Sequence, residues 1–144
     1  MPQGPPPTHP HVRPILIVDD VASEALTLRL LCQSLGVDAV TTASPAEAAA
    51  ILLRLRPAGI ITDLVMPGAD GLDCLYMIAG HAPTVPVMVV TASEKLLLKA
   101  ASELGDVYGL ADLVCVAKPV DVPTLQAFVA RAGAPSRPPR AALH

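Results

Sequence analysis

The chain has 144 residues, of which 52% are hydrophobic and 16% are charged, and its formal charge is −3. This length predicts one domain with its own buried core, and the apolar composition excludes a disordered protein. Nucleic-acid binders usually present a basic face or stacking aromatic rings. With an acidic balance and only three aromatic residues, this chain is not expected to bind nucleic acid.

The longest uncharged stretch, residues 74–93, is interrupted by glycine and by two prolines. It therefore lacks the continuous apolar pattern of a membrane-spanning helix, and no contact with a membrane is expected. The N-terminal residues contain no apolar stretch of the kind found in secretory signals. The cysteines form no CxxC motif, so reduced core thiols in a cytoplasmic protein are expected at Cys32, Cys74 and Cys115.

Proline is concentrated at the two ends of the chain. Six of the 16 prolines lie in residues 1–14 and three lie in residues 133–144. This distribution predicts a Pro-rich disordered tail over 1–14, a folded domain over 15–132 and a flexible tail over 133–144. Because about a dozen residues follow the last predicted helix, the domain is expected to stand alone, without an effector domain.

The first half of the domain alternates strand and helix patterns. A wholly apolar strand is expected at Ile15–Val18, followed by a helix at Ala22–Leu35 that ends before a glycine. A second strand is expected at Asp38–Thr42. The sequence Ser44-Pro45-Ala46-Glu47 is a capping box, which predicts a helix that continues to about Arg56.

The second half repeats this alternation. A buried strand at Gly59–Thr62 leads into a turn-rich segment, Met66–Gly71, in which Asp70 and Gly71 are expected to form a turn. Five βα units in this order predict an α/β fold with a parallel sheet and helices on both faces. The remaining expected elements are helix Leu72–Ala79, strand Val85–Val90, helix Glu94–Leu104, strand Leu113–Ala117 and helix Val122–Ala132.

Polar residues follow several of the predicted strands directly. In parallel sheets, ligands bind beyond the carboxyl ends of the strands, so these residues are expected to meet at one edge. Asp and Lys are poorly suited to strand interiors, and each abrupt change from apolar to charged residues therefore marks an exposed strand end. The residues concerned are Asp19, Asp20, Asp63, Thr91 and Lys118.

Three carboxylates held close together repel one another unless a cation is present. Two unit charges about 4 Å apart repel by roughly 4 kcal/mol at an effective dielectric near 20. A hard cation such as Mg²⁺ would relieve this repulsion, and a third carboxylate could then attack a phosphoryl group. Lys118 and Thr91 could stabilise the transferring oxygens. On these grounds alone, the carboxylate that reacts stays open.

Four motifs in this order resemble the receiver domain of bacterial two-component response regulators, including the chemotaxis-type single-domain receivers. They are Asp19-Asp20 after the first strand, the segment Asp63-Leu64-Val65-Met66-Pro67-Gly68-Ala69-Asp70-Gly71, Val89-Val90-Thr91-Ala92-Ser93, and Lys118-Pro119. The resemblance covers residues 15–132. It implies a doubly wound (βα)₅ fold with a five-stranded parallel sheet, of the flavodoxin-like kind.

The resemblance also implies a role for each matched residue. Asp63 would be the phosphoacceptor, and Thr91 and Lys118 would assist it. The Mg²⁺ ligands would be Asp19, Asp20, Asp63 and the backbone carbonyl of Val65. The phosphoryl donor would be a sensor histidine kinase or a histidine phosphotransfer protein. The chain would be no enzyme beyond its own phosphorylation and dephosphorylation, and it would signal by binding a downstream protein.

One departure from the family pattern lies three residues before Lys118, where many receivers have an aromatic residue and this chain has Cys115. We therefore expect conformational change mainly in the backbone from Thr91 to Leu110. Two alternatives stay open. One is a small aspartyl-phosphate phosphohydrolase, although those enzymes use a DxD pair that Asp19-Asp20-Val21 does not provide. The other is a receiver fold used as a phosphorylation-independent interaction module.

Overall fold

The computed structural model describes residues 13–66, 69–95, 109–110 and 112–133. The predicted tails therefore lie almost entirely outside the described residues. Most of the helix predicted at Glu94–Leu104, and much of the backbone from Thr91 to Leu110, also lie outside them.

A five-stranded parallel sheet forms the centre of the molecule, with the strand order β2-β1-β3-β6-β7. The strands are β1 (Ile15–Val18), β2 (Ala39–Thr42), β3 (Gly59–Asp63), β6 (Val87–Thr91) and β7 (Leu113–Ala117). The described helices are α1 (Ala22–Ser34), α2 (Pro45–Leu55), α3 (Gly71–His81) and α5 (Val122–Gly133). This arrangement confirms the predicted doubly wound α/β fold.

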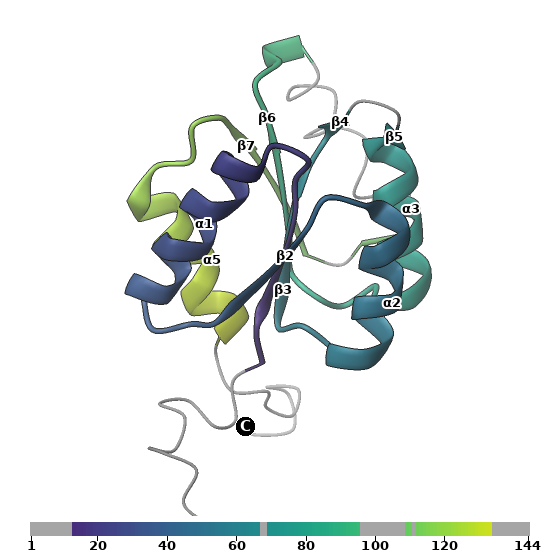
Figure 1. Cartoon of the computed structure of the whole chain (residues 1–144), viewed down its shortest axis with the longest axis horizontal. Helices are drawn as coiled ribbons and strands as arrows, with labels where there is room; N and C mark the ends of the chain where they lie inside the picture. The colour runs from purple at the N-terminus through teal and green to yellow at the C-terminus, as the bar shows by residue number, and fades with distance from the viewer. Residues whose placement is uncertain (1–12, 67–68, 96–108, 111, 134–144) are drawn as a thin grey trace, which may run out of the picture.

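Helices cover both faces of the sheet, with α1 and α5 on one side and α2 and α3 on the other (Figure 1). Successive side chains of a strand point to opposite faces, so each strand contributes to two cores. In β1, Leu16 and Val18 pack in the core beneath α2 and α3. Ile15 and Ile17 pack in the core beneath α1 and α5. Burial on both faces explains why β1 is wholly apolar.

The structure corrects the sequence prediction between β3 and α3. Val65–Met66 forms β4 and Ala69–Asp70 forms β5, and these two short strands pair antiparallel. Asp70 is thus a strand residue, and Gly71 begins α3. Strands of two residues are too short to show the alternation from which a strand is predicted. The one proline and the two glycines around them indicate only a turn.

The capping box predicted at α2 forms in part, because the glutamate side chain bonds to a threonine and not to the Ser44 backbone. The Glu47 backbone N–H donates to Ser44 Oγ over 3.2 Å. The Glu47 carboxylate does not close the box on the Ser44 backbone but accepts from the Thr42 hydroxyl, over 2.6 Å. The Ser44 N–H donates to that same hydroxyl oxygen over 3.2 Å. The end of β2 and the start of α2 are thereby joined by side-chain hydrogen bonds.

Two of the three cysteines are fully buried, as expected. Cys32 and Cys74 have no exposed surface, whereas Cys115 is half-buried against the core beneath α2 and α3. Burial raises the pKa of Cys32 to about 11 and also raises the pKa of Cys115. These side chains are therefore protonated thiols near neutral pH, and they pack as small apolar groups.

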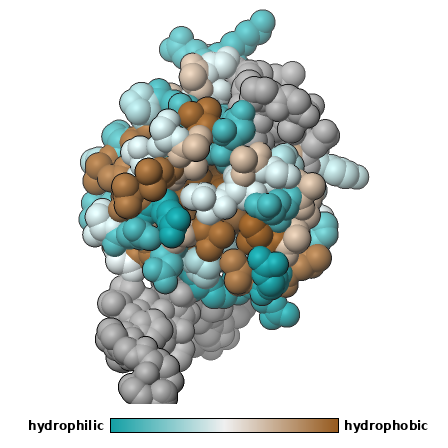
Figure 2. All heavy atoms as spheres, viewed as in Figure 1, coloured by the Kyte–Doolittle hydropathy of each residue, from teal (hydrophilic) through white to brown (hydrophobic). Residues whose placement is uncertain are grey.

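Apolar side chains also reach the surface over α1. Figure 2 shows brown patches there, where Leu26 and Leu30 are 52% and 54% exposed. Among the described helices, none combines the length and the apolar character needed to cross a membrane.

Candidate functional site

The register of the sheet brings the predicted site residues to one edge. Val18 lies opposite Thr62, so Asp19 and Asp63 follow at the same level of two adjacent strands. On the other side of β3, Asp63 lies opposite Val90. The backbone N–H of Lys118 donates to the carbonyl oxygen of Thr91 over 2.9 Å, which places the lysine beside the end of β6.

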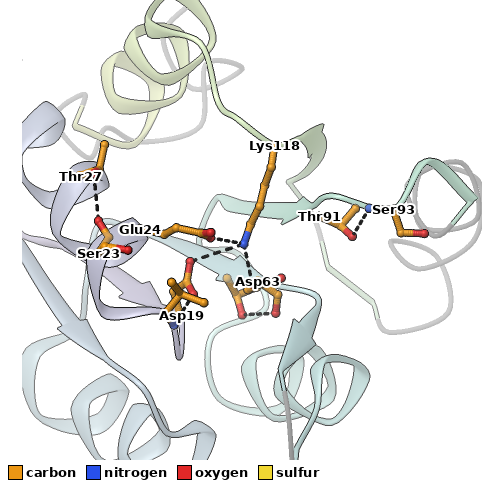
Figure 3. Close-up of polar contacts among 10 residues, drawn as sticks. Asp19, Ser23, Glu24, Thr27, Asp63, Thr91, Ser93 and Lys118 are labelled. Atoms are coloured by element: carbon orange, nitrogen blue, oxygen red, sulfur yellow. Dashed lines mark hydrogen bonds and ion pairs between the residues drawn. The ribbon is translucent and has the colours of Figure 1, made fainter.

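The ammonium of Lys118 points into a group of three carboxylates (Figure 3). Its Nζ atom donates to Asp63 Oδ2 over 2.7 Å and lies 3.8 Å from Asp19 Oδ2. It also donates to Glu24 Oε1 in the first turn of α1. Lys118, the residue directly after β7, therefore connects the ends of β1 and β3 with α1.

The surroundings of these groups set their protonation. Burial alone lowers the pKa of Lys118, but its hydrogen bonds with Asp63 and Glu24 and the charge of Asp19 outweigh burial and raise that pKa. Lys118 is therefore a permanent cation. For Asp19, burial raises the pKa, and this effect exceeds the opposing effects of the Val21 hydrogen bond and the Lys118 charge. The folded protein thus holds the Asp19 carboxylate at a net cost.

Two buried carboxylate oxygens without a hydrogen-bond partner suit a divalent cation. Asp19 Oδ2 and Asp20 Oδ1 are buried and accept no hydrogen bond. One carboxylate oxygen from each of Asp19, Glu24 and Asp63 lies within 4.8 Å of the other two. Buried carboxylate oxygens normally have a hydrogen-bond partner or a metal ion. Oxygen donors at the sheet edge are the ligands that Mg²⁺ prefers, so the residues present suit this ion.

Two further predicted residues lie at the same edge. Thr91 is 1% exposed at the end of β6, and its hydroxyl oxygen accepts from the Ser93 backbone N–H over 3.1 Å. In Figure 3, Thr91 lies on the opposite side of Asp63 from Glu24. Val65 begins β4, two residues beyond Asp63, and the role of its carbonyl stays a prediction.

Glu24 is the residue of this site that the sequence analysis did not identify. It lies five positions after Asp19 on α1, where a charged residue normally indicates only a solvated helix face. Its side chain is 46% exposed, yet its carboxylate reaches Lys118. The weak signal available in the sequence is its place in the first turn of the helix that follows Asp19-Asp20.

A cavity of about 440 Å³ adjoins the carboxylates on the α1 side. Glu24 and Lys118 lie where it meets the site, and Leu28, Leu31 and Val120 contribute apolar walls. Glu24 therefore lines this cavity and also contacts the ammonium.

Comparison with known proteins extends over most of the chain. The family profile of the response regulator receiver domain matches residues 15–130. The DNA-binding response regulator MtrA of Mycobacterium tuberculosis is 32% identical over 78 residues, which are 54% of this chain and 34% of that protein. The DNA-binding transcriptional regulator NtrC of Escherichia coli is 29% identical over 82% of this chain and 24% of its own length. The chain thus spans about a third or less of these relatives.

A solved structure shows the same fold. The response regulator receiver domain protein from Clostridium thermocellum superposes with a TM-score of 0.71 at 24% identity, over 84% of this chain and 94% of that one. The family profile covers the whole sheet and every strand end that contributes to the carboxylate site. The chain therefore belongs to the response regulator receiver domain family.

Proposed function

We propose that this chain is a phosphorylation-dependent signalling switch that accepts a phosphoryl group on Asp63 in the presence of Mg²⁺. The observation that carries the proposal is the juxtaposition of two groups at one sheet edge. A permanent cation donates to the carboxylate of Asp63. At the end of β1, the strand next to β3, Asp19 and Asp20 have buried oxygens without hydrogen bonds. This arrangement supplies a nucleophile, a cation binding site and a charge that receives an anion.

The proposed reaction is a phosphoryl transfer from a phosphohistidine of a sensor kinase or a phosphotransfer protein. A carboxylate oxygen of Asp63 forms a bond to phosphorus, the bond from phosphorus to the imidazole nitrogen breaks, and that nitrogen keeps the electron pair. The Lys118 ammonium and the Thr91 hydroxyl donate to the phosphoryl oxygens as their charge develops. Asp19, Asp20, Asp63 and the Val65 carbonyl would hold Mg²⁺, which neutralises charge on the transferring group when it is bound.

On this proposal the chain acts on itself and is no enzyme toward other molecules. Its output would be contact with another protein in the cytoplasm. The relatives are named as DNA-binding regulators, but this chain spans only a part of each of them. Residues 15–132 carry 13 acidic and seven basic side chains, so this part of the chain has a net charge of 7 − 13 = −6. Such a charge opposes contact with the phosphate backbone of DNA.

The test is the variant Asp63→Asn, incubated with Mg²⁺ and acetyl phosphate and examined by intact mass. We expect the natural chain to gain the mass of one phosphoryl group and the variant to gain none, because an amide cannot form an acyl phosphate. Asp38→Asn is the matched control, since it removes one exposed carboxylate just before β2 and should be labelled normally. Equal labelling of Asp63→Asn would contradict the assignment of the acceptor.

A further inference from the structure

We infer that Glu24 is a positioning residue that holds the Lys118 ammonium in the resting state and competes for it with the incoming phosphoryl group. This inference rests on the proposed function, because it concerns the same lysine. Glu24, a residue of α1, would hold the lysine in place but would not itself carry the phosphoryl group.

The geometry shows that two carboxylates share one ammonium. Lys118 Nζ donates both to Glu24 Oε1 and to Asp63 Oδ2, and it lies 3.8 Å from Asp19 Oδ2. An ammonium has three N–H donors. Two of them are committed to carboxylates, so at most one N–H is left for a phosphoryl group on Asp63, and a second hydrogen bond to that group requires the exchange of a partner.

Solvent exposure identifies which partner is exchanged. The side chain of Asp63 is 6% exposed and that of Glu24 is 46% exposed. A half-exposed carboxylate regains water when it leaves the ammonium, whereas a buried one does not. Glu24 also borders the cavity beside the site, which provides space for its side chain to turn away from Lys118.

The charge of the phosphoryl group explains why the loss of the Glu24 contact with Lys118 would matter. A phosphoryl group on Asp63 brings close to two negative charges, while a Glu24 oxygen lies within 4.8 Å of Asp63 and Asp19 oxygens. As long as Glu24 holds Lys118, the incoming group meets a cation whose charge is already partly neutralised. Removal of the Glu24 contact therefore frees positive charge for the phosphoryl oxygens.

The first test needs neither phosphoryl transfer nor metal. In the Mg²⁺-free protein, the ammonium resonance of Lys118 is followed by NMR in the natural chain and in Glu24→Gln. We expect a clear change of chemical shift and faster proton exchange in the variant. An unchanged resonance would show that Glu24 does not hold Lys118 and would overturn the inference.

The second test measures the rate of phosphorylation by acetyl phosphate with saturating Mg²⁺. Glu24→Gln should react about two- to fivefold faster than the natural chain, the change that a half-exposed ion pair supports. Glu24→Asp keeps the charge but shortens the side chain, so it should match Glu24→Gln. The Asp38→Asn variant should match the natural chain. An acceleration in Glu24→Gln that is absent from Glu24→Asp would indicate a field effect of the charge alone and would overturn the inference.

A Mg²⁺ titration separates this role from that of a metal ligand. We expect Glu24→Gln to bind Mg²⁺ within about threefold of the natural chain, a change no larger than a half-exposed charge supports. A loss of more than tenfold would make Glu24 a metal ligand and overturn the inference. If the natural chain accepts no phosphoryl group at all, the proposed function is wrong. If the natural chain is labelled but Glu24→Gln reacts no faster, only the role of Glu24 is wrong.

Discussion

Asp19 carries the clearest energetic cost in the candidate site. One carboxylate oxygen accepts from the Val21 backbone over 2.9 Å, and the other is buried without a hydrogen bond. Burial raises the pKa of Asp19 even with Lys118 nearby. The ionised side chain is therefore less stable in the folded protein than in the unfolded chain.

We predict that Asp19→Asn stabilises the Mg²⁺-free protein by on the order of 1 kcal/mol, because the amide removes the buried charge and keeps an oxygen for the Val21 N–H. The rise in melting temperature on addition of Mg²⁺ should shrink in the same variant. Thermal denaturation with and without Mg²⁺ measures both effects. A variant that keeps the full Mg²⁺-dependent rise would show that Asp19 is not a principal ligand.

The sequence was sufficient to predict those site residues that directly follow a strand. Asp19, Asp63 and Lys118 each interrupt or end an apolar run, and a parallel sheet collects such ends at one edge. Glu24 has no such marker, because its participation depends on the direction in which a long side chain leaves α1. That direction is set by tertiary contacts, which no periodicity in the sequence reveals.

At the level of the helices, Asp121 caps α5. Its Oδ1 atom accepts from the Thr124 backbone N–H over 2.8 Å. Hydrogen bonding with the Thr124 side chain, and then with its backbone, lowers the pKa of Asp121. Because the pKa is lower in the folded state, the carboxylate stabilises the fold above about pH 4, the ordinary value for aspartate. This contribution to the free energy of unfolding is lost as the pH falls through the pKa of Asp121 in the folded protein.

The prediction for α5 is a difference in pH dependence. Asp121→Asn keeps a capping oxygen without a titrating group. Its unfolding free energy should therefore fall less steeply than that of the natural chain as the pH is lowered below about 4. Urea denaturation at a series of pH values measures these slopes. Equal slopes in the two proteins would show that the Asp121 cap does not contribute.

The contact between α5 and the sheet depends on a glycine. A Cβ atom on Gly59 would lie 2.8 Å from the Cβ of Ala132 and 3.2 Å from Cζ of Phe128, both in α5. Gly80, near the end of α3, would meet nothing within 4 Å. The two glycines therefore form a matched pair for the same substitution.

Gly59→Ala should destabilise the fold by about 1–3 kcal/mol, because α5 must shift to accept the methyl group. Gly80→Ala should stabilise it by roughly 0.5–1 kcal/mol through helix propensity. Chemical denaturation of both variants provides the comparison. A Gly59→Ala protein as stable as the natural chain would mean that α5 packs less closely on β3 than the structure shows.

For the whole molecule, the alternation of strand and helix patterns was enough to predict the architecture. Apolar runs such as Ile15–Val18 required burial on both faces, and only a sheet between two helical layers provides it. The boundaries of the elements follow less directly from the pattern. The strand predicted from Val85 begins at Val87, because Pro86 has no N–H to donate to a ladder. The β4–β5 pair depends on contacts beyond the reach of local patterns.

The sequence distances within the site have a consequence for how the protein matures. Lys118 joins Asp63 across 55 positions and Glu24 across 94, and contacts this remote form only after intervening loops have closed. A nascent or partly assembled chain that lacks β7 has an acceptor aspartate without its lysine. On the proposed function, such a chain lacks the ammonium that stabilises the transferred phosphoryl group. The stabilised form of the acceptor site therefore arises late in folding, since the acceptor and its lysine come together only when the sheet has closed.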